Sequence, residues 1–171
     1  LFGSGAIMTE VLRAQSLLKE FGVSADVWSV TSYNELCREA LHVERANLLA
    51  GHSADSGSKT RPWVQELLAE ETGVFVAASD YMKALPLSIS RWVPGPYVVL
   101  GTDGYGLSES RPDLRTWFEV SAEYVAWAAL AALGDKGVIS REELATAALT
   151  LGIRASKPDP AYAGPASHTN G

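Results

Sequence analysis

Two short segments hold most of the side chains that could recognise a ligand or a partner. Residues 101–111 (GTDGYGLSESR), here called the glycine loop, carry three glycines within six residues, and residues 79–83 (SDYMK), here called the Asp80 segment, follow an apolar run. Glycine tolerates positive φ and lets another surface come close to the backbone. The candidate residues for an interface or for the entrance to an active site are Asp80, Lys83, Asp103, Gly104, Tyr105, Gly106, Ser108, Ser110 and Arg111.

Each segment also has an ordinary structural interpretation. The glycine loop could simply connect a strand to the helix that begins at Ser110, and Ser79 or Asp80 could cap a helix. Their positions favour a functional role, because both follow predicted strands and the carboxyl ends of strands form the functional edge of open α/β sheets. The structural and the interfacial interpretation therefore both stay open at this point.

A further glycine-rich turn, Gly3-Ser4-Gly5, stands where a dinucleotide-binding fingerprint would lie, between a strand and a helix. The fingerprint needs a small residue where Met8 stands, and an acidic residue at the end of the second strand, which instead ends Ser29-Val30-Thr31. A tight turn is the favoured interpretation. The glycine loop is not a phosphate-binding loop either, because no Gly-Lys-Ser/Thr follows it.

Other chemistry-bearing residues lack the partners that catalysis or metal binding requires. His42, His52 and His168 do not have metal-ligand spacing. Cys37, the only cysteine, is interpreted as a structural thiol, and no Gly-x-Ser-x-Gly nucleophile turn is present. We therefore predict no catalytic, cofactor-binding or metal-binding residue within this segment.

Composition narrows the class of protein. The 171 residues suit one domain and are 47% apolar, while the net charge of −6 argues against nucleic-acid and acidic-membrane partners. No apolar run approaches the roughly 20 residues of a membrane-spanning helix. A single cysteine excludes an internal disulfide and suits a reducing compartment, so we expect a cytoplasmic protein.

Short apolar runs alternate with helical patterns along the chain. The predicted strands are residues 1–3, 25–30, 74–78 and 97–100, and the predicted helices are residues 7–21, 32–49, 62–69, a segment from Asp80 to before Trp92, and helices that begin at Ser110, Ser121 and Ser140. Ser32 with Glu35, and Ser140 with Glu143, form capping boxes. In the first helix Glu10 and Arg13 fall outside the apolar face.

This alternation predicts an α/β protein, a three-layer α/β/α sandwich with a mostly parallel sheet of four or five strands. We expect the first strand to be truncated, because Leu1 begins in mid-strand, and the chain to be a piece of a longer polypeptide. Residues 1–153 are predicted to form the domain, with an exposed, mobile loop at 50–61. Residues 154–171, rich in Pro, Ala, Ser and Gly, are predicted to be a flexible tail.

Four blocks occur in a recognisable order: Gly3-Ser4-Gly5 followed by VLR at 11–13, DVWSVTS at 26–32, the Asp80 segment, and the glycine loop. With them the chain resembles the C-terminal, transketolase-like domain of the homodimeric pyruvate dehydrogenase E1 family, up to about Ile153. The resemblance implies an α/β/α sandwich whose first strand is antiparallel to the others, a strand that we expect this chain to lack.

The resemblance also implies a function for the whole enzyme. Such an enzyme binds thiamine diphosphate and Mg²⁺ between its other two domains across a homodimer interface, decarboxylates pyruvate, and passes the acetyl unit to the lipoyl group of the dihydrolipoamide acetyltransferase (E2) component. Its cofactor motif and activating glutamate belong to regions outside this chain, so no cofactor is expected in the fragment, which alone should be inactive. The implied role is to support the dimer, with the glycine loop facing a partner domain or subunit near the active-site entrance.

Two alternatives remain, namely another transketolase-like 2-oxo acid dehydrogenase E1 and a free-standing, non-enzymatic α/β interaction module. Two local expectations can be checked against the structure. Asp103 is expected to pair with Arg111 or with a residue of a neighbouring domain. A β-branched residue at Gly104 is expected to lower stability or weaken dimer formation by about 1–3 kcal/mol if the φ of Gly104 is positive.

Overall fold

The computed structural model describes residues 1–50 and 59–164. Its sheet has four parallel strands in the order β2-β1-β3-β4. The strands are β1 (Phe2–Gly3), β2 (Trp28–Ser29), β3 (Phe75–Ala78) and β4 (Tyr97–Leu100). The helices are α1 (Met8–Glu20), α2 (Tyr33–Ala50), α3 (Trp63–Leu67), α4 (Ala84–Leu87), α5 (Arg111–Trp117), α6 (Ala122–Asp135) and α7 (Arg141–Thr150), with short 3-10 turns at Gly5–Ile7 and Ser90–Trp92.

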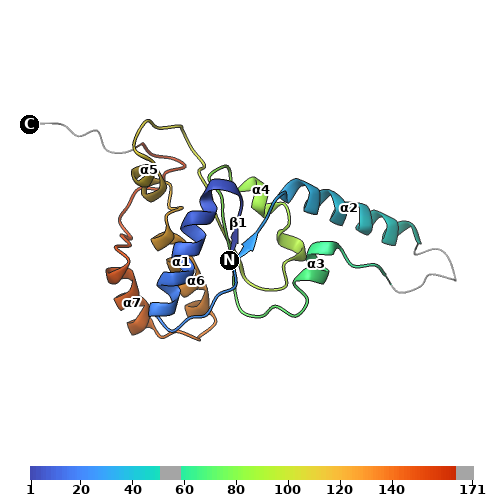
Figure 1. Ribbon diagram of the computed structural model, residues 1–171, viewed down its shortest axis with the longest axis horizontal. Helices are drawn as coiled ribbons and strands as arrows, with labels where there is room; N and C mark the ends of the chain where they lie inside the picture. Colours follow the sequence, from blue (N-terminus) through green and yellow to red (C-terminus); the bar gives the residue numbers. More distant parts are fainter. Residues whose placement is uncertain (51–58, 165–171) are drawn as a thin grey trace, which may run out of the picture.

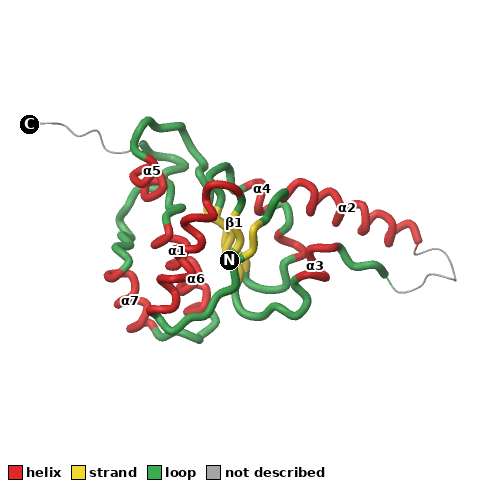
Figure 2. The backbone as a smooth tube through the Cα atoms, in the orientation of Figure 1, coloured by secondary structure: helices red, strands yellow, loops and turns green. Residues whose placement is uncertain are grey.

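The sheet stands between two helical layers (Figures 1 and 2). One layer contains α1, α5, α6 and α7, and the other contains α2, α3 and α4. Alternation along β3 explains this arrangement, because Val76 and Ala78 face the core formed with α1 and α6, whereas Phe75 and Ala77 face the core formed with α2 and α3. The predicted α/β/α sandwich with a parallel sheet is confirmed.

The second strand is shorter than predicted. Of residues 25–30 only Trp28 and Ser29 form β2, since their neighbour β1 has just two residues to pair with. The Trp28 N–H donates to the Leu1 carbonyl at 2.8 Å, and the Val30 N–H donates to the Gly3 carbonyl at 2.8 Å. The ladder ends where β1 ends.

Of the two predicted capping boxes, that of α7 is confirmed and that of α2 is found in part. Ser140 and Glu143 form the full capping box of α7, and Ser110 caps α5 by accepting from the Asp113 N–H. Ser32 accepts from the Glu35 N–H at 3.2 Å. Ser121 stands at the start of α6, but its hydroxyl donates to the side chain of Glu123 and accepts no cap hydrogen bond.

The helix predicted from Asp80 begins instead at Ala84. Residues 80–83 precede the helix, because the Tyr81 carbonyl and the Lys83 N–H bond to the glycine loop and the Tyr81 N–H donates to the Ser79 hydroxyl. Of the predicted loop at 50–61, Lys59, Thr60 and Arg61 are exposed, and residues 51–58 lie outside the described residues. Within the described ranges no helix is long and apolar enough to span a membrane.

The segment after Ile153, for which composition predicts a flexible tail, lies against the domain as far as Gly164. The Lys157 side chain is 5% exposed and ion-pairs with Glu119 at 3.1 Å. The flexibility of this segment stays a prediction. The remaining part of the predicted tail, 165–171, lies outside the described residues.

Candidate functional site

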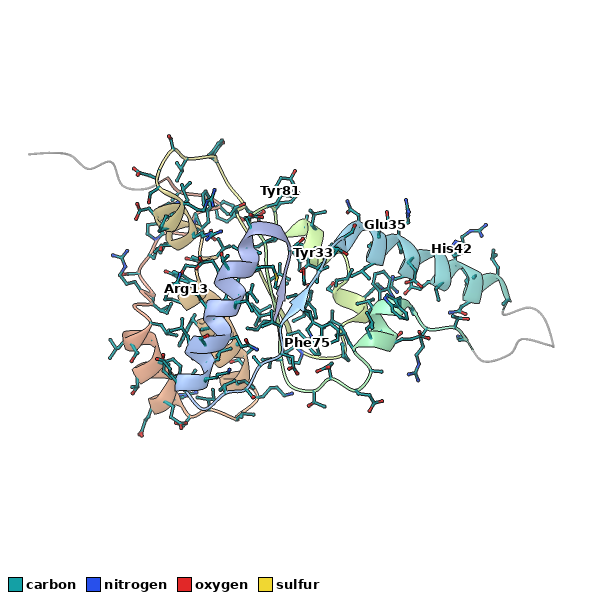
Figure 3. All side chains as sticks on the ribbon, viewed as in Figure 1. Arg13, Tyr33, Glu35, His42, Phe75 and Tyr81 are labelled. Atoms are coloured by element: carbon teal, nitrogen blue, oxygen red, sulfur yellow. The ribbon has the colours of Figure 1, made fainter. Side chains whose placement is uncertain are left out.

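The two segments singled out from the sequence lie together at the carboxyl edge of the sheet. The Thr102 N–H donates to the Tyr81 carbonyl at 3.0 Å. The Lys83 N–H donates to the Asp103 carboxylate at 3.1 Å. Tyr81, labelled in Figure 3, lies at the upper edge of the view, between α5 and α4 as they are labelled in Figure 1. Because β3 and β4 are adjacent and parallel, the segments that follow them leave the sheet side by side.

The observed partner of Asp103 lies in the Asp80 segment. Its carboxylate accepts from the Lys83 backbone N–H, and within the described residues it forms no ion pair with Arg111. Lys83 thus contributes its main chain to this junction, while its aliphatic stem covers Gly101. This hydrogen bond connects the Asp80 segment to the glycine loop, and the pairing of Asp103 with a neighbouring domain stays a prediction.

Two of the three loop glycines have a clear physical requirement. A Cβ on Gly101 would lie 2.8 Å from the Tyr81 carbonyl oxygen and 2.9 Å from the Lys83 nitrogen, so only glycine permits this approach of the two segments. Gly104 has a φ of +113°, which meets the condition set for its predicted sensitivity. A Cβ on Gly106 would meet no atom within 4 Å.

A groove of about 380 Å³ lies beside this junction. Its walls come from the turn after β1, the glycine loop, α5 and the residues that follow α5. Phe118 and Val120 form a buried apolar floor, and Leu107 is half-buried above them. The charged side chains on the groove are Asp80, Arg111 and Arg115. Such a groove suits contact with an apolar side chain or loop that carries a charge at its edge.

The remaining candidates divide into exposed and structural residues. Tyr105 is 89% exposed, and Ser108 and Arg111 are also exposed. Ser110 is occupied as the cap of α5. The exposed side chains of Asp80, Tyr105 and Arg111 on the rim of the groove are therefore the ones available to a partner surface.

Glu10 is a buried residue at this site that sequence reasoning placed on an outer face of α1. It is 6% exposed and accepts from the Arg115 guanidinium at 2.8 Å, from Arg13 at 3.1 Å and from the Ala122 N–H at 2.9 Å. Arg115 also donates to the Ala6 carbonyl at 3.1 Å, which connects the turn after β1 to α5. The carboxylate thus replaces Ser121 as the acceptor for the first amide of α6.

Glu10 gives only a weak signal in the sequence. It precedes the buried Val11 by one position, and its partners Arg115 and Ala122 lie more than a hundred residues away. Glu123 extends the same network by pairing with Arg13 at 3.2 Å. Burial alone would raise the pKa of Glu123, but the Ser121 hydroxyl, its own N–H and Arg13 outweigh burial and lower that pKa.

The described residues offer little for acid–base or metal chemistry. No group of three or more His, Cys, Asp or Glu side chains within them is arranged to hold a metal ion. Cys37 is a free, half-buried thiol. Tyr33, labelled in Figure 3 at the start of α2, is buried, and burial raises its pKa well above the ordinary value, so its hydroxyl stays protonated. The arrangement at the groove is suited to binding and positioning.

A second groove of about 460 Å³ lies in the other helical layer, at the open edge of β2. Trp28, Leu36 and Leu67 line it, together with Trp63, which is 54% exposed. Glu39 accepts from the Trp63 N–H at 3.0 Å and so fixes the start of α3.

Comparison with known proteins agrees with this architecture. The family profile of the transketolase-like TK C-terminal domain matches residues 1–121. The pyruvate dehydrogenase E1 component of Pseudomonas aeruginosa is 46% identical over 162 residues, that of Cupriavidus necator is 42% identical over 161, and that of Escherichia coli K12 is 40% identical over 165. These matches cover 94%, 94% and 95% of this chain but 18% of each relative. Because the family match includes every strand of the sheet, the chain belongs to the transketolase-like C-terminal domain family.

Proposed function

We propose that this chain is the C-terminal domain of a thiamine-diphosphate-dependent pyruvate dehydrogenase E1, which decarboxylates pyruvate oxidatively and transfers the acetyl unit to the lipoyl group of an E2 component. The relatives that carry the name pyruvate dehydrogenase E1 component support the proposal, since they align with almost the whole chain. The junction of the Asp80 segment and the glycine loop at the sheet edge is the observation that carries the proposed role of the domain.

In this proposal the domain positions a surface and performs no chemical step. Asp103 and Gly101 hold the two segments together, and the network of Glu10 and Arg115 holds the turn after β1 against α5. The groove between them presents Tyr105 and Arg111 to a neighbouring domain or subunit near the active-site entrance. Precise placement of such surfaces contributes to rate because reacting groups must be held in register.

Thiamine diphosphate and Mg²⁺ would supply the carbanion chemistry in the whole enzyme. The described residues do not fit as their binding site, because they contain no converging set of metal ligands and no helix N-terminus with a phosphate-binding glycine motif. We propose, as the family resemblance implies, that other parts of the enzyme bind the cofactor.

The proposed assembly is a homodimer that works with the dihydrolipoamide acetyltransferase in the cytoplasm. The second groove, with the exposed Trp63 and the open edge of β2, is a further apolar surface that the rest of the enzyme could cover. The single cysteine and the net charge of −6 agree with a reducing compartment and with partners other than nucleic acids.

The test is a kinetic comparison in the full-length enzyme. Arg111→Ala and Tyr105→Ala are expected to lower kcat/KM for pyruvate about fivefold or more, which corresponds to the roughly 1 kcal/mol lost when an interface side chain is truncated. Leu149→Ala is the control, because this side chain is 84% exposed on α7, outside the groove. Unchanged kinetics in both variants would contradict the proposed role of the loop.

Substrate tests distinguish the alternatives. A full-length enzyme that prefers a larger 2-oxo acid to pyruvate would place the chain in another E1 of the same group. A native polypeptide of about the mass of this chain, 18.3 kDa, with no thiamine-dependent activity, would instead indicate a free-standing interaction module.

A further inference from the structure

The chain does not leave the domain after α7 but returns to the site. From Arg154 it runs back along α5 toward the glycine loop (Figure 1). The segment forms its own turns, since the Lys157 N–H donates to the Arg154 carbonyl at 3.1 Å and the Ala161 N–H donates to the Asp159 carboxylate at 2.8 Å. We call residues 154–163 the strap.

Lys157 anchors the strap beneath the surface. Its side chain is 5% exposed, and its ammonium group donates to the Trp117 carbonyl and to the Glu119 carboxylate, the latter at 3.1 Å. The ammonium also lies 4.7 Å from the ring centroid of Trp117 and 5.9 Å from that of Tyr124. A buried cation requires such compensation, and a carboxylate, a carbonyl and two aromatic faces supply it.

The anchor acts on the turn that forms the floor of the groove. Among the described residues Glu119 is the one non-glycine residue with positive φ, at 60°, a conformation that persists only when its surroundings enforce it. The N–H groups of Val120 and Ser121 both donate to the Arg115 carbonyl, and Lys157 holds the Glu119 side chain. The flanking residues Phe118 and Val120 line the groove directly.

The far end of the strap covers the glycine loop itself. A Cβ on Gly104 would collide with the Pro160 carbonyl oxygen and would lie 3.3 Å from the Ala161 Cα. The strap backbone therefore lies directly on the loop at its left-handed residue. Residues 104–106 are exposed around this contact.

We propose that the strap holds the glycine loop and the Glu119 turn in the arrangement that forms the groove, with Lys157 as its positioning residue. Only the expected effect of the strap on enzyme activity rests on the proposed function. Lys157 binds Glu119, which stands between the groove-lining residues Phe118 and Val120, and Pro160 lies against Gly104 in the glycine loop. Releasing the strap therefore removes support from both sides of the groove. The C-terminal segment thereby sets how ordered the proposed entrance surface is.

Hydrogen exchange of backbone amides in the full-length enzyme tests the anchor. Lys157→Met keeps the stem and removes the charge, and it is expected to speed exchange in a peptide covering residues 102–110 roughly tenfold or more, with residues 8–20 of α1 unchanged. Lys157→Arg should restore much of the protection. The matched control is Lys136→Met, because within the described residues the exposed Lys136 ammonium donates only to the Gly73 carbonyl, at 3.2 Å.

The proposal is overturned if exchange in 102–110 stays within about twofold of the wild type in Lys157→Met, or if it rises equally in α1, which would indicate general loosening. Gly104→Ala tests the other contact from the loop side. It should accelerate exchange in residues 154–163, whereas Gly106→Ala, with open space around it, should not. Equal effects of the two alanines on the strap would also overturn the proposal.

Kinetics separate this inference from the proposed function. If Lys157→Met loosens the loop and lowers kcat/KM for pyruvate, both are supported. If it loosens the loop while kcat and KM stay at wild-type values, the strap stands and the proposed role of the loop at the active-site entrance fails.

Discussion

Replacing Glu10 by alanine should be among the most damaging single changes in this domain. The carboxylate is 6% exposed and accepts from Arg115, Arg13 and the Ala122 N–H. Its removal leaves the Arg115 guanidinium, whose side chain is 14% exposed, without its carboxylate, and it leaves the first amide of α6 without its acceptor. Three structural elements, α1, α5 and α6, lose their common connection.

The magnitude follows from these contacts. Removing one partner of a buried ion pair lowers the free energy of unfolding by about 3–5 kcal/mol, and we take about 3 kcal/mol because water partly reaches Arg115 and Arg13. Loss of a helix cap adds about 1 kcal/mol. The sum of about 4 kcal/mol corresponds to a fall in Tm of about 8–16 °C for a domain of this size.

Urea unfolding of the chain measures this loss, with Glu10→Gln and Arg13→Ala as comparisons. Glu10→Gln keeps an acceptor for the Ala122 N–H and should lose less than Glu10→Ala. Arg13 is 61% exposed, so Arg13→Ala should change the free energy of unfolding by about 0–1 kcal/mol. The reasoning is refuted if Glu10→Ala loses less than about 1 kcal/mol, or if Arg13→Ala is equally destabilising.

The other stability predictions concern the glycine loop and a helix cap. Gly104→Val should lower the free energy of unfolding by about 1–3 kcal/mol, because the φ of Gly104 is +113° and the Pro160 carbonyl occupies the space of the new side chain. Thermal unfolding measures this loss, with Gly106→Val as the control. Equal melting temperatures for the two variants would contradict the prediction. For α7, hydrogen bonds from the Ser140 hydroxyl and N–H lower the pKa of Glu143 below 4.5. The stabilisation from Glu143 is therefore present above pH 4.5 and is lost as the pH falls through the pKa of Glu143 in the folded protein. The Tm values of wild type and Glu143→Gln should accordingly converge in acid. A Tm difference between them that stays constant with pH would count against the capping role.

Local patterns were sufficient to predict the sheet and most of its connections. The runs at 74–78 and 97–100 are β-branched or apolar, and they form β3 and β4 with almost the predicted bounds. The capping box of Ser140 and Glu143 is a signal confined to four residues, which explains why it could be read without knowledge of the fold. Parallel strands then required both candidate segments to leave the sheet at one edge.

The partners of the polar residues could not be predicted in the same way. Asp103 bonds to a backbone amide 20 positions away, and Glu10 bonds to one 112 positions away. No local periodicity encodes such pairs, because they depend on which helix end meets which side chain after the layers pack. Glu10 therefore looked like a surface residue, although α6 begins directly over it.

By itself, the sequence determined the class of fold, the family resemblance and the two segments that meet at the sheet edge, since these depend on short-range pattern and composition. Only the tertiary structure decided that Asp103 accepts from the Lys83 N–H, that Glu10 is buried, and that Pro160 and Ala161 lie against the glycine loop. The physical reason is that burial and charge pairing between distant segments outweigh local propensity wherever the two disagree. Lys157 shows this most clearly, because the composition of residues 154–163 predicts no packing, whereas the Lys157 side chain is 5% exposed and ion-pairs with Glu119.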